Sequence, residues 1–271
     1  MTVIESTKNP RLRAAAALRD RRERDRQGLT LVDGVREVRR AVEAGVDVAE
    51  AFVDVARLAD ADVELLRTLR ASGGSVHEVA PAALARIAFG DRSDGVVAVV
   101  RIPETRIDTL DLPPDPLVVV VEDVEKPGNL GAIVRSADGA GVDAVVVADP
   151  LTDVFNPNTI RASLGTVFGM RLAAASSADV RRWLTARQIR VIAARVDAAA
   201  LYTAMDLTGP VAIVLGSEAE GLSSEWSDPA VIAVRLPMLG RADSLNVSVA
   251  AAVLLYEARR QRGLPDASEQ A

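Results

Sequence analysis

Three short segments of the chain place amide, hydroxyl, carboxylate and guanidinium groups among glycine residues. They are residues 129–135 (Asn-Leu-Gly-Ala-Ile-Val-Arg), residues 216–222 (Gly-Ser-Glu-Ala-Glu-Gly-Leu) and residues 236–246, which run from Leu-Pro-Met to Ser-Leu-Asn. Glycine allows positive φ and a close approach of the backbone to a ligand. The side chains that could bind such a ligand and stabilise developing charge are Asn129, Arg135, Glu218, Ser244 and Asn246.

The residue types argue against several common chemistries. The chain has no cysteine and a single histidine, His77, so we expect neither a thiol nucleophile, nor a Ser-His-Asp triad, nor a metal site. No Gly-x4-Gly-Lys-Ser/Thr phosphate loop occurs, and residues 128–131 lack the Gly-x-Gly-x-x-Gly spacing of dinucleotide-binding folds. A doubly wound nucleotide-binding enzyme is therefore a weak alternative. We expect His77 at the surface or at a strand edge.

The net charge of −6 is distributed unevenly. Residues 1–40 carry eleven Lys/Arg and six Asp/Glu, a local charge of +5, which leaves −11 for the remainder. The mixed charges of residues 10–27 either pair along a solvated helix face or form an arm that contacts phosphates of a nucleic acid. In the second interpretation the contacts are Lys8, Arg11, Arg22 and Arg36.

No apolar run approaches the about 20 residues that a membrane-spanning helix requires. The first residues also lack the apolar core of a signal peptide. We therefore expect a cytoplasmic protein without membrane contact.

The first hundred residues alternate between helical and strand patterns. A helix is predicted over residues 10–27 and a buried apolar strand over residues 95–101. Between them the patterns predict strands at residues 29–32, 49–53 and 75–79 and helices at residues 34–44, 60–71 and 81–87. These elements predict a compact α/β unit.

Residues 102–116 contain four prolines and no periodicity, which is typical of a semi-rigid linker. We therefore predict an N-terminal domain over residues 1–102, a proline-rich linker over residues 103–116 and a second domain over residues 117–271.

The second domain has the pattern of a parallel α/β sheet. Strands are predicted at residues 117–121, 144–148, 190–194, 211–215 and 231–236, with helices to about Ala140 and over residues 159–168. Loops 122–131, 216–222 and 237–246 follow three of these strands, at the sheet edge where ligands bind. Asp243 or Ser244 is expected to cap a last helix that runs through Tyr256, apolar on most faces and suited to burial against a helix or a second subunit.

Together these loops resemble a known family. Asn129-x-Gly131-x3-Arg135, Gly216-x-Glu218-x2-Gly221-Leu222, and Leu236-Pro-Met followed by Ser244-Leu-Asn-Val-Ser-Val-Ala resemble the three ordered motifs of the SpoU/TrmH RNA 2′-O-methyltransferases of the SPOUT superfamily. The match covers roughly residues 115–260.

The N-terminal half is similar to the smaller ribosomal-protein-like α/β domain that binds RNA in this family. The similar segments are residues 8–11, 31–34 and 93–98. Asp33 stands where members usually carry glutamate, which is a mild departure.

The resemblance implies a C-terminal parallel-sheet SPOUT domain with a deep trefoil knot, a homodimer, and S-adenosylmethionine as the cofactor. By the same resemblance the cofactor-binding residues are Leu215, Gly216, Ser217, Gly221, Leu236, Met238, Ser244, Leu245 and Asn246. No metal is implied.

The implied reaction moves a methyl group from a sulfonium to a ribose 2′-hydroxyl, with Arg135, Asn129 and Glu218 as the catalytic residues. A guanidinium has a pKa above about 12, so we interpret Arg135 as a clamp on the target phosphate and the emerging alkoxide rather than as a base. Asn129 would hold the ribose or the arginine, and Glu218 would orient one of them through charge-assisted hydrogen bonds.

The favoured substrate is 23S ribosomal RNA, modified as housekeeping or as protection against an antibiotic; the sequence does not choose between them. Transfer RNA is an alternative substrate. A non-catalytic RNA-binding assembly factor is an alternative of another class, although the intact motifs argue against it. Aromatic residues make up 3% of the chain, so extensive base stacking is not expected.

Overall fold

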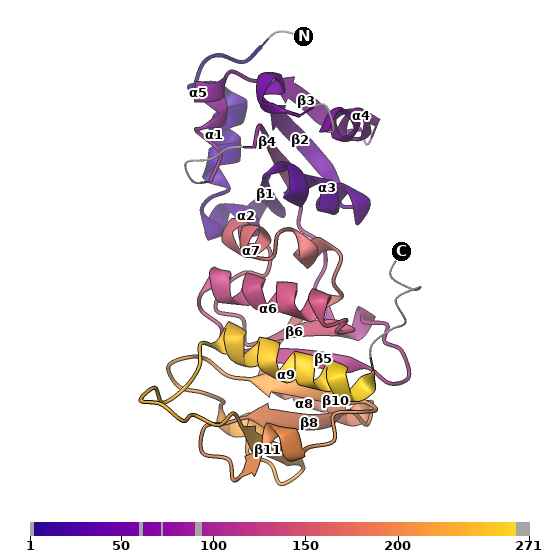
Figure 1. Cartoon of the computed structure of the whole chain (residues 1–271). Coiled ribbons are helices and arrows are strands. Elements are labelled where there is room, and N and C mark those ends of the chain that lie inside the picture. Colours follow the sequence, from indigo (N-terminus) through magenta and orange to yellow (C-terminus); the bar gives the residue numbers. More distant parts are fainter. Residues whose placement is uncertain (1–2, 60–61, 72, 90–93, 264–271) are drawn as a thin grey trace. The chain divides into compact units, whose positions relative to one another are not determined.

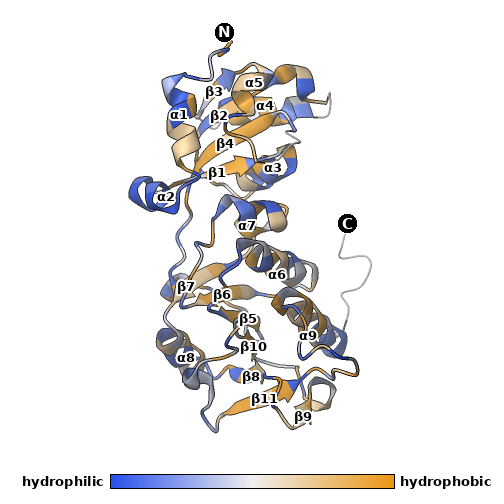
Figure 2. Ribbon diagram, turned by 90° about the vertical axis from the view of Figure 1, so that its left-hand side faces the viewer, coloured by the Kyte–Doolittle hydropathy of each residue, from blue (hydrophilic) through white to orange (hydrophobic). Residues whose placement is uncertain are grey.

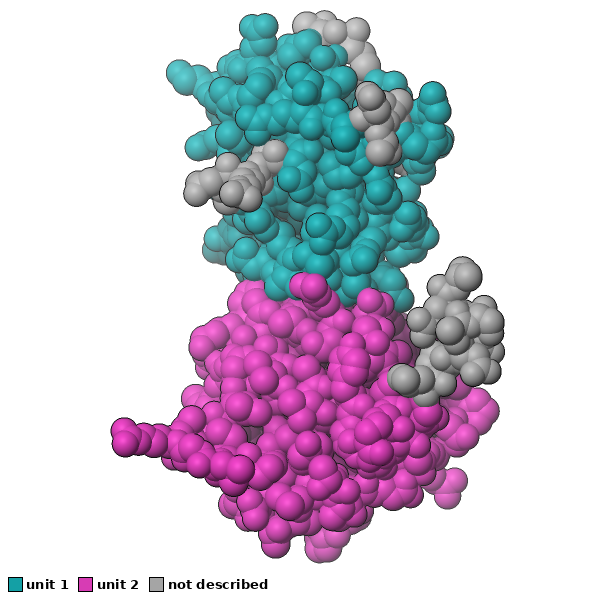
Figure 3. All heavy atoms as spheres, viewed as in Figure 1, with its two compact units in different colours: residues 1–103, 155–169 teal, residues 104–154, 170–271 magenta. Residues whose placement is uncertain are grey.

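The computed structural model describes residues 3–59, 62–71, 73–89 and 94–263 (Figure 1). Ser93 and the first two residues of the predicted helix 60–71 lie outside the described residues. The chain divides into two compact units, shown in different colours in Figure 3. Unit 1 comprises residues 1–103 and 155–169, and unit 2 comprises residues 104–154 and 170–271.

Unit 1 contains a four-stranded sheet in the order β1-β4-β2-β3. Strand β4 pairs antiparallel with β1 and β2, and β3 pairs parallel with β2 at the edge, where it carries His77 as expected. The strands are β1 (Leu29–Asp33), β2 (Val48–Val53), β3 (Ser75–Glu78) and β4 (Val96–Arg101). The helices are α1 (Pro10–Ala17), α2 (Arg21–Gln27), α3 (Val35–Glu43), α4 (Val63–Ala71) and α5 (Pro81–Leu84).

The helix predicted over residues 10–27 is two helices, so this prediction was wrong. The chain leaves α1 at Leu18, and the Asp20 side chain caps α2 by accepting a hydrogen bond from the backbone N–H of Arg22 at 2.8 Å. Arg24 is buried in this break and donates to the carbonyl oxygens of Leu18 and Arg19, both at 2.8 Å. One arginine of the basic run therefore stabilises the fold and does not face solvent.

Residues 155–169 pack within unit 1 although they come from the C-terminal half of the sequence. The segment contains α7 (Pro157–Ala162) and a 3-10 turn, in place of the single helix predicted over residues 159–168. Thr30 Oγ1 donates to the carbonyl oxygen of Phe155 at 2.8 Å, and Arg40 donates to that of Leu164 at 2.9 Å. The segment thus completes unit 1.

Asp33, at the end of β1, is the buried acid at this contact. Its carboxylate accepts a hydrogen bond from the backbone N–H of Phe89 at 2.6 Å and lies 3.3 Å from Arg161 Nη1 of α7. Burial raises the pKa of Asp33 to about 6, a rise that Phe89 and Arg161 oppose and that nearby Asp94 and Glu37 reinforce.

We expect Asp33 to make unit 1 less stable as the pH rises from about 4 to about 6. Its folded-state pKa is raised, so the folded protein binds the extra proton in this window, and the free energy of unfolding falls by about 2 kcal/mol across it. Asp33→Asn should abolish this slope, because Asn does not titrate. Urea unfolding at several pH values measures it, with the exposed carboxylate variant Asp47→Asn as control. Identical pH dependence in Asp33→Asn and wild type would contradict the assignment.

Unit 2 contains a seven-stranded sheet in the order β7-β6-β5-β10-β8-β11-β9, and its neighbouring strands pair in parallel. The strands are β5 (Leu117–Glu122), β6 (Ala144–Ala148), β7 (Leu172–Ala175), β8 (Arg190–Ala194), β9 (Ala200–Leu201), β10 (Val211–Leu215) and β11 (Val231–Arg235). The β-branched runs predicted as strands are confirmed, and burial of both faces explains their lack of alternation.

Helices cover both faces of this sheet. Figure 2 shows α8 (Ser177–Ala186) on one side and the neighbouring helices α6 (Pro127–Gly139) and α9 (Val247–Arg262) on the other. The sequence analysis did not predict β7 or α8. The α/β class with a parallel sheet in the second half of the chain is confirmed, whereas the knot stays a prediction.

Helix α9 begins later than predicted. Its N-cap is Asn246, whose side chain accepts hydrogen bonds from the backbone N–H of Ser248 at 3.0 Å and from its hydroxyl at 2.6 Å. The expected caps, Asp243 and Ser244, belong to the preceding loop. They were wrong because the loop stays non-helical through Asn246 and the first helical residue is Val247.

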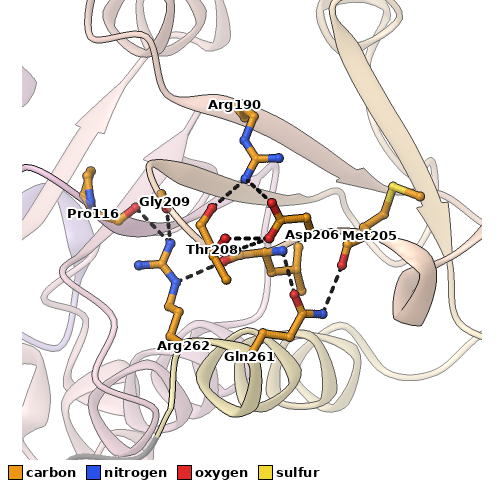
Figure 4. Close-up of polar contacts among 9 residues, drawn as sticks. Pro116, Arg190, Met205, Asp206, Thr208, Gly209, Gln261 and Arg262 are labelled. Carbon is orange, nitrogen blue, oxygen red and sulfur yellow. Dashed lines mark hydrogen bonds and ion pairs between the residues drawn. The ribbon is translucent and has the colours of Figure 1, made fainter.

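The C-terminal turn of α9 forms hydrogen bonds with the loop before β10 (Figure 4). Gln261 donates to the carbonyl oxygen of Met205 at 3.0 Å and accepts from the backbone N–H of Leu207 at 2.8 Å. Arg262 donates to the carbonyl oxygens of Leu207 and Gly209. These bonds satisfy loop carbonyls and hold α9 against the sheet.

Candidate cofactor and catalytic site

A cavity of about 590 Å³ lies at the carboxyl edge of the sheet in unit 2. It is enclosed by the loop after β10, the loop between β11 and α9, and the residues that follow β8. The predicted cofactor-binding residues that line it are Leu215, Gly216, Ser217, Gly221, Leu236, Met238, Ser244 and Leu245. Asn246, the ninth, is not among the lining residues.

The loop after β10 closes on itself at a neck. The backbone N–H groups of Ser217 and Gly221 donate to each other's carbonyl oxygens at 3.1 and 3.2 Å. Gly221 has a φ of +71°, and a Cβ on Gly216 would lie 2.1 Å from the Gly221 carbonyl oxygen. Both positions therefore require glycine, which explains these residues of the second motif in steric terms.

Three predicted polar residues meet beside the cavity. Asn246 Nδ2 donates to Glu218 Oε1 and, at 3.3 Å, to Asn129 Oδ1. The other oxygen of Glu218 lies 2.8 Å from Lys126 Nζ, and this hydrogen bond holds the pKa of Glu218 below its usual 4.5. The network joins residues that are 117 positions apart in the chain.

Asn129 lies in the first turn of α6, because this helix begins at Pro127 and not after Gly131 as predicted. It opens on a smaller cavity of about 90 Å³. The two cavities share the residues Ser217, Glu218, Ala219 and Val247. A ligand in the larger cavity would therefore have the Asn129 amide as a near neighbour.

Arg135 is not brought to these residues. It lies on α6, six positions after Asn129, so the two side chains leave different sides of the helix. Arg135 is exposed, and it lines neither of the two cavities described above. The structure of one chain thus assembles the Asn129–Glu218–Asn246 network without the predicted guanidinium.

The predicted phosphate contacts lie on the surface of unit 1. Lys8, Arg11, Arg22 and Arg36 are all exposed. Arg11 forms an ion pair with Glu50 at 2.8 Å.

The sequence analysis missed three residues at this site, Lys126, Arg195 and Asp197, and one buried residue outside its lining, Glu122. Lys126 holds Glu218, and Arg195 and Asp197 line the cavity as a pair joined by two hydrogen bonds of 3.0 and 3.1 Å. Glu122 is a carboxylate at the end of the apolar strand β5. A charged residue within such a buried run is unusual, and this feature of the sequence could have identified it.

Residues 116–256 match the family model described as SpoU rRNA Methylase family. The chain belongs to the SpoU rRNA methylase family. Residues 9–98 match the MRM3-like substrate binding domain. The SpoU relatives include the 23S rRNA (uridine(2479)-2′-O)-methyltransferase of Streptomyces viridochromogenes, 35% identical over 91% of this chain and 88% of the relative. The 23S rRNA (guanosine(2553)-2′-O)-methyltransferase RlmP of Bacillus subtilis is 28% identical over 96% and 100%.

Solved structures of SpoU enzymes have the same fold. An RNA 2′-O ribose methyltransferase is 42% identical, with a TM-score of 0.86 over 96% of this chain and 99% of the other. The SpoU methyltransferase AviRb from Streptomyces viridochromogenes, in complex with AdoMet, is 34% identical, with a TM-score of 0.86 over 94% and 98%.

These comparisons confirm the predicted family, the methyltransferase activity and S-adenosylmethionine as the family's cofactor. The homodimer and the roles of the individual site residues stay predictions. Within the described residues, no helix has both the length and the apolarity needed to cross a bilayer.

Proposed function

We propose that this chain methylates a ribose 2′-hydroxyl in 23S ribosomal RNA, with S-adenosylmethionine as the donor. The observation that carries the proposal is the cavity framed by two of the motif loops, with the Asn129–Glu218–Asn246 network at its edge. The curated relatives that it matches over most of their length act on 23S rRNA according to their names. Because ribosomal RNA is the substrate, we also propose a cytoplasmic location.

The cavity residues fit the cofactor. Leu215, Leu236 and Met238 give apolar walls for a flat adenine ring, and Gly216 and Gly221 add lining without side chains. The polar side chains of Ser217 and Ser244 lie on the same lining. When bound, the cofactor supplies an electrophilic methyl group on a positively charged sulfur.

The protein's own part in the reaction is orientation and charge stabilisation. A ribose hydroxyl is a poor nucleophile at neutral pH, so its approach must be fixed and the negative charge on its oxygen balanced. Asn129 and Asn246 offer amide groups, and Glu218 holds the Asn246 amide in place. Arg135 supplies the balancing positive charge in our assignment.

A homodimer accounts for the position of Arg135. Val249 and Tyr256 form a stripe on α9 at helical spacing, and they are 48% and 53% exposed. Leu245 at the cavity is 39% exposed. We propose that a second copy of the chain covers this apolar face and completes a site to which Arg135 contributes.

Methyl transfer to 23S rRNA tests the proposal. Wild type with tritiated S-adenosylmethionine should label the RNA, and Arg135→Ala should label it at least about 100-fold more slowly. Arg171→Ala, which removes another exposed arginine of unit 2, is the matched control and should keep full activity. Absence of labelling by wild type, or full activity in Arg135→Ala, would defeat the proposal. Where wild type labels the RNA, primer-extension stops map the methylated nucleotide.

A further inference from the structure

Glu122 is a fully buried carboxylate that the proposed reaction does not use. It is the last residue of β5, with 0% of its surface exposed, after a run of leucine and valine residues. Removing a carboxylate from water is costly unless hydrogen-bond donors replace the water. The groups that surround Glu122 therefore indicate what it holds in place.

Four donors converge on the Glu122 carboxylate. Oε1 accepts from the Ser177 hydroxyl, from the Ser223 hydroxyl at 2.8 Å and from Trp226 Nε1 at 2.8 Å. Oε2 accepts from the backbone N–H of Ser223 at 2.8 Å. Ser177 begins α8, whereas Ser223 and Trp226 belong to the chain that leaves the loop after β10.

The sheet holds the start of the loop after β10, and the two hydrogen bonds from Ser223 to Glu122 hold its end. The loop leaves β10 at Leu215, closes through the Ser217–Gly221 neck and continues through Leu222 to Ser223. Leu222 lines the large cavity, and Glu218 lies between the two anchored ends. The positions of both depend on where Ser223 is held.

We propose that Glu122 is a positioning residue for the cofactor cavity. From within the core it anchors Ser223, and through Ser223 it holds residues 216–222 in the shape that forms the cavity wall and presents Glu218 to Asn246. The inference rests on the proposed function, because the cavity is taken to be the cofactor site.

Glu122→Gln tests the anchor with little change in volume. The amide keeps one acceptor oxygen and replaces the other with an NH2 donor. The remaining oxygen takes the place of Oε1, where the Ser177 and Ser223 hydroxyls can rotate to donate to it. The new amide group then faces the Ser223 N–H, which is also a donor. We expect the dissociation constant for S-adenosylmethionine, measured by calorimetry, to rise about tenfold or more, which corresponds to losing one hydrogen bond to a charged group.

Two serine variants separate positioning from general stability. Ser223→Ala and Ser177→Ala each remove one hydroxyl donor to Glu122 Oε1, so both should lower the melting temperature by a similar amount. Only Ser223→Ala should weaken cofactor binding, because Ser223 directly follows Leu222 of the cavity wall, whereas Ser177 belongs to α8. Equal weakening by both variants, or unchanged affinity in Glu122→Gln, would overturn the inference.

Amide hydrogen exchange gives a readout without cofactor. Faster exchange of residues 216–222 in Glu122→Gln and Ser223→Ala, with wild-type rates in Ser177→Ala, supports the anchor even if wild type fails to bind S-adenosylmethionine. That failure would count against the proposed function alone. Unchanged exchange in this loop in Glu122→Gln would contradict the inference.

Discussion

Asn246→Asp is expected to lower methyl transfer by at least about 100-fold while the protein stays folded. Asn246 Oδ1 caps α9, and a carboxylate oxygen keeps this role. Nδ2, however, donates to Glu218 and Asn129, and the substitution replaces it with an oxygen. Two carboxylates in contact resist simultaneous ionisation, so Glu218 and the new side chain should separate and the network should open.

The pH profile distinguishes this cause from a loss of folding. Protonating one carboxyl restores a hydrogen bond between the pair, so the activity of Asn246→Asp relative to wild type should rise as the pH falls. Ser248→Ala is the matched control, since it removes one bond to the cap but leaves the Nδ2 contacts, and it should keep most activity. Near-normal methyl transfer by Asn246→Asp at neutral pH would contradict a role for this network.

A fragment of residues 104–271 is expected to aggregate when produced alone. Residues 155–169 would then lack the rest of unit 1, in which Phe155, Ile160 and Val167 are buried. Exposing each such side chain costs roughly 1.5–3 kcal/mol. Size-exclusion chromatography after expression measures the outcome.

Co-expression with residues 1–103 supplies the control for this fragment. The two pieces should form a soluble complex, because Thr30 and Arg40 of the first piece bind the carbonyl oxygens of Phe155 and Leu164 in the second. A soluble, monodisperse 104–271 fragment would show that the segment does not need unit 1.

Local patterns determined much of unit 2. The runs 117–121, 144–148 and 211–215 fold as buried parallel strands, as their short length and their β-branched residues indicate. Residues 172–175, Leu-Ala-Ala-Ala, carry no comparable signal. Helix α8 did carry a sequence signal. Ser176 is its N-cap, and the acidic residue Asp179 follows three residues later, which is the spacing of a capping box.

The order of the motif residues also allowed the family and its cofactor to be predicted from the sequence. The spacing of Gly216, Glu218 and Gly221 has a steric cause that the structure makes explicit, because the neck excludes a side chain at Gly216. The conformation of a short loop depends mainly on the types of its own residues, so the spacing of these residues is visible in the sequence.

Only the tertiary structure decided which distant residues meet. It placed Asn129, Glu218 and Asn246 together, left Arg135 outside the two cavities, folded residues 155–169 into unit 1 and buried Arg24 and Glu122. Helical and strand periodicity specify which face of an element is apolar. They do not specify its neighbour, because strand order, loop paths and the donors around a buried charge are fixed only when the whole chain packs.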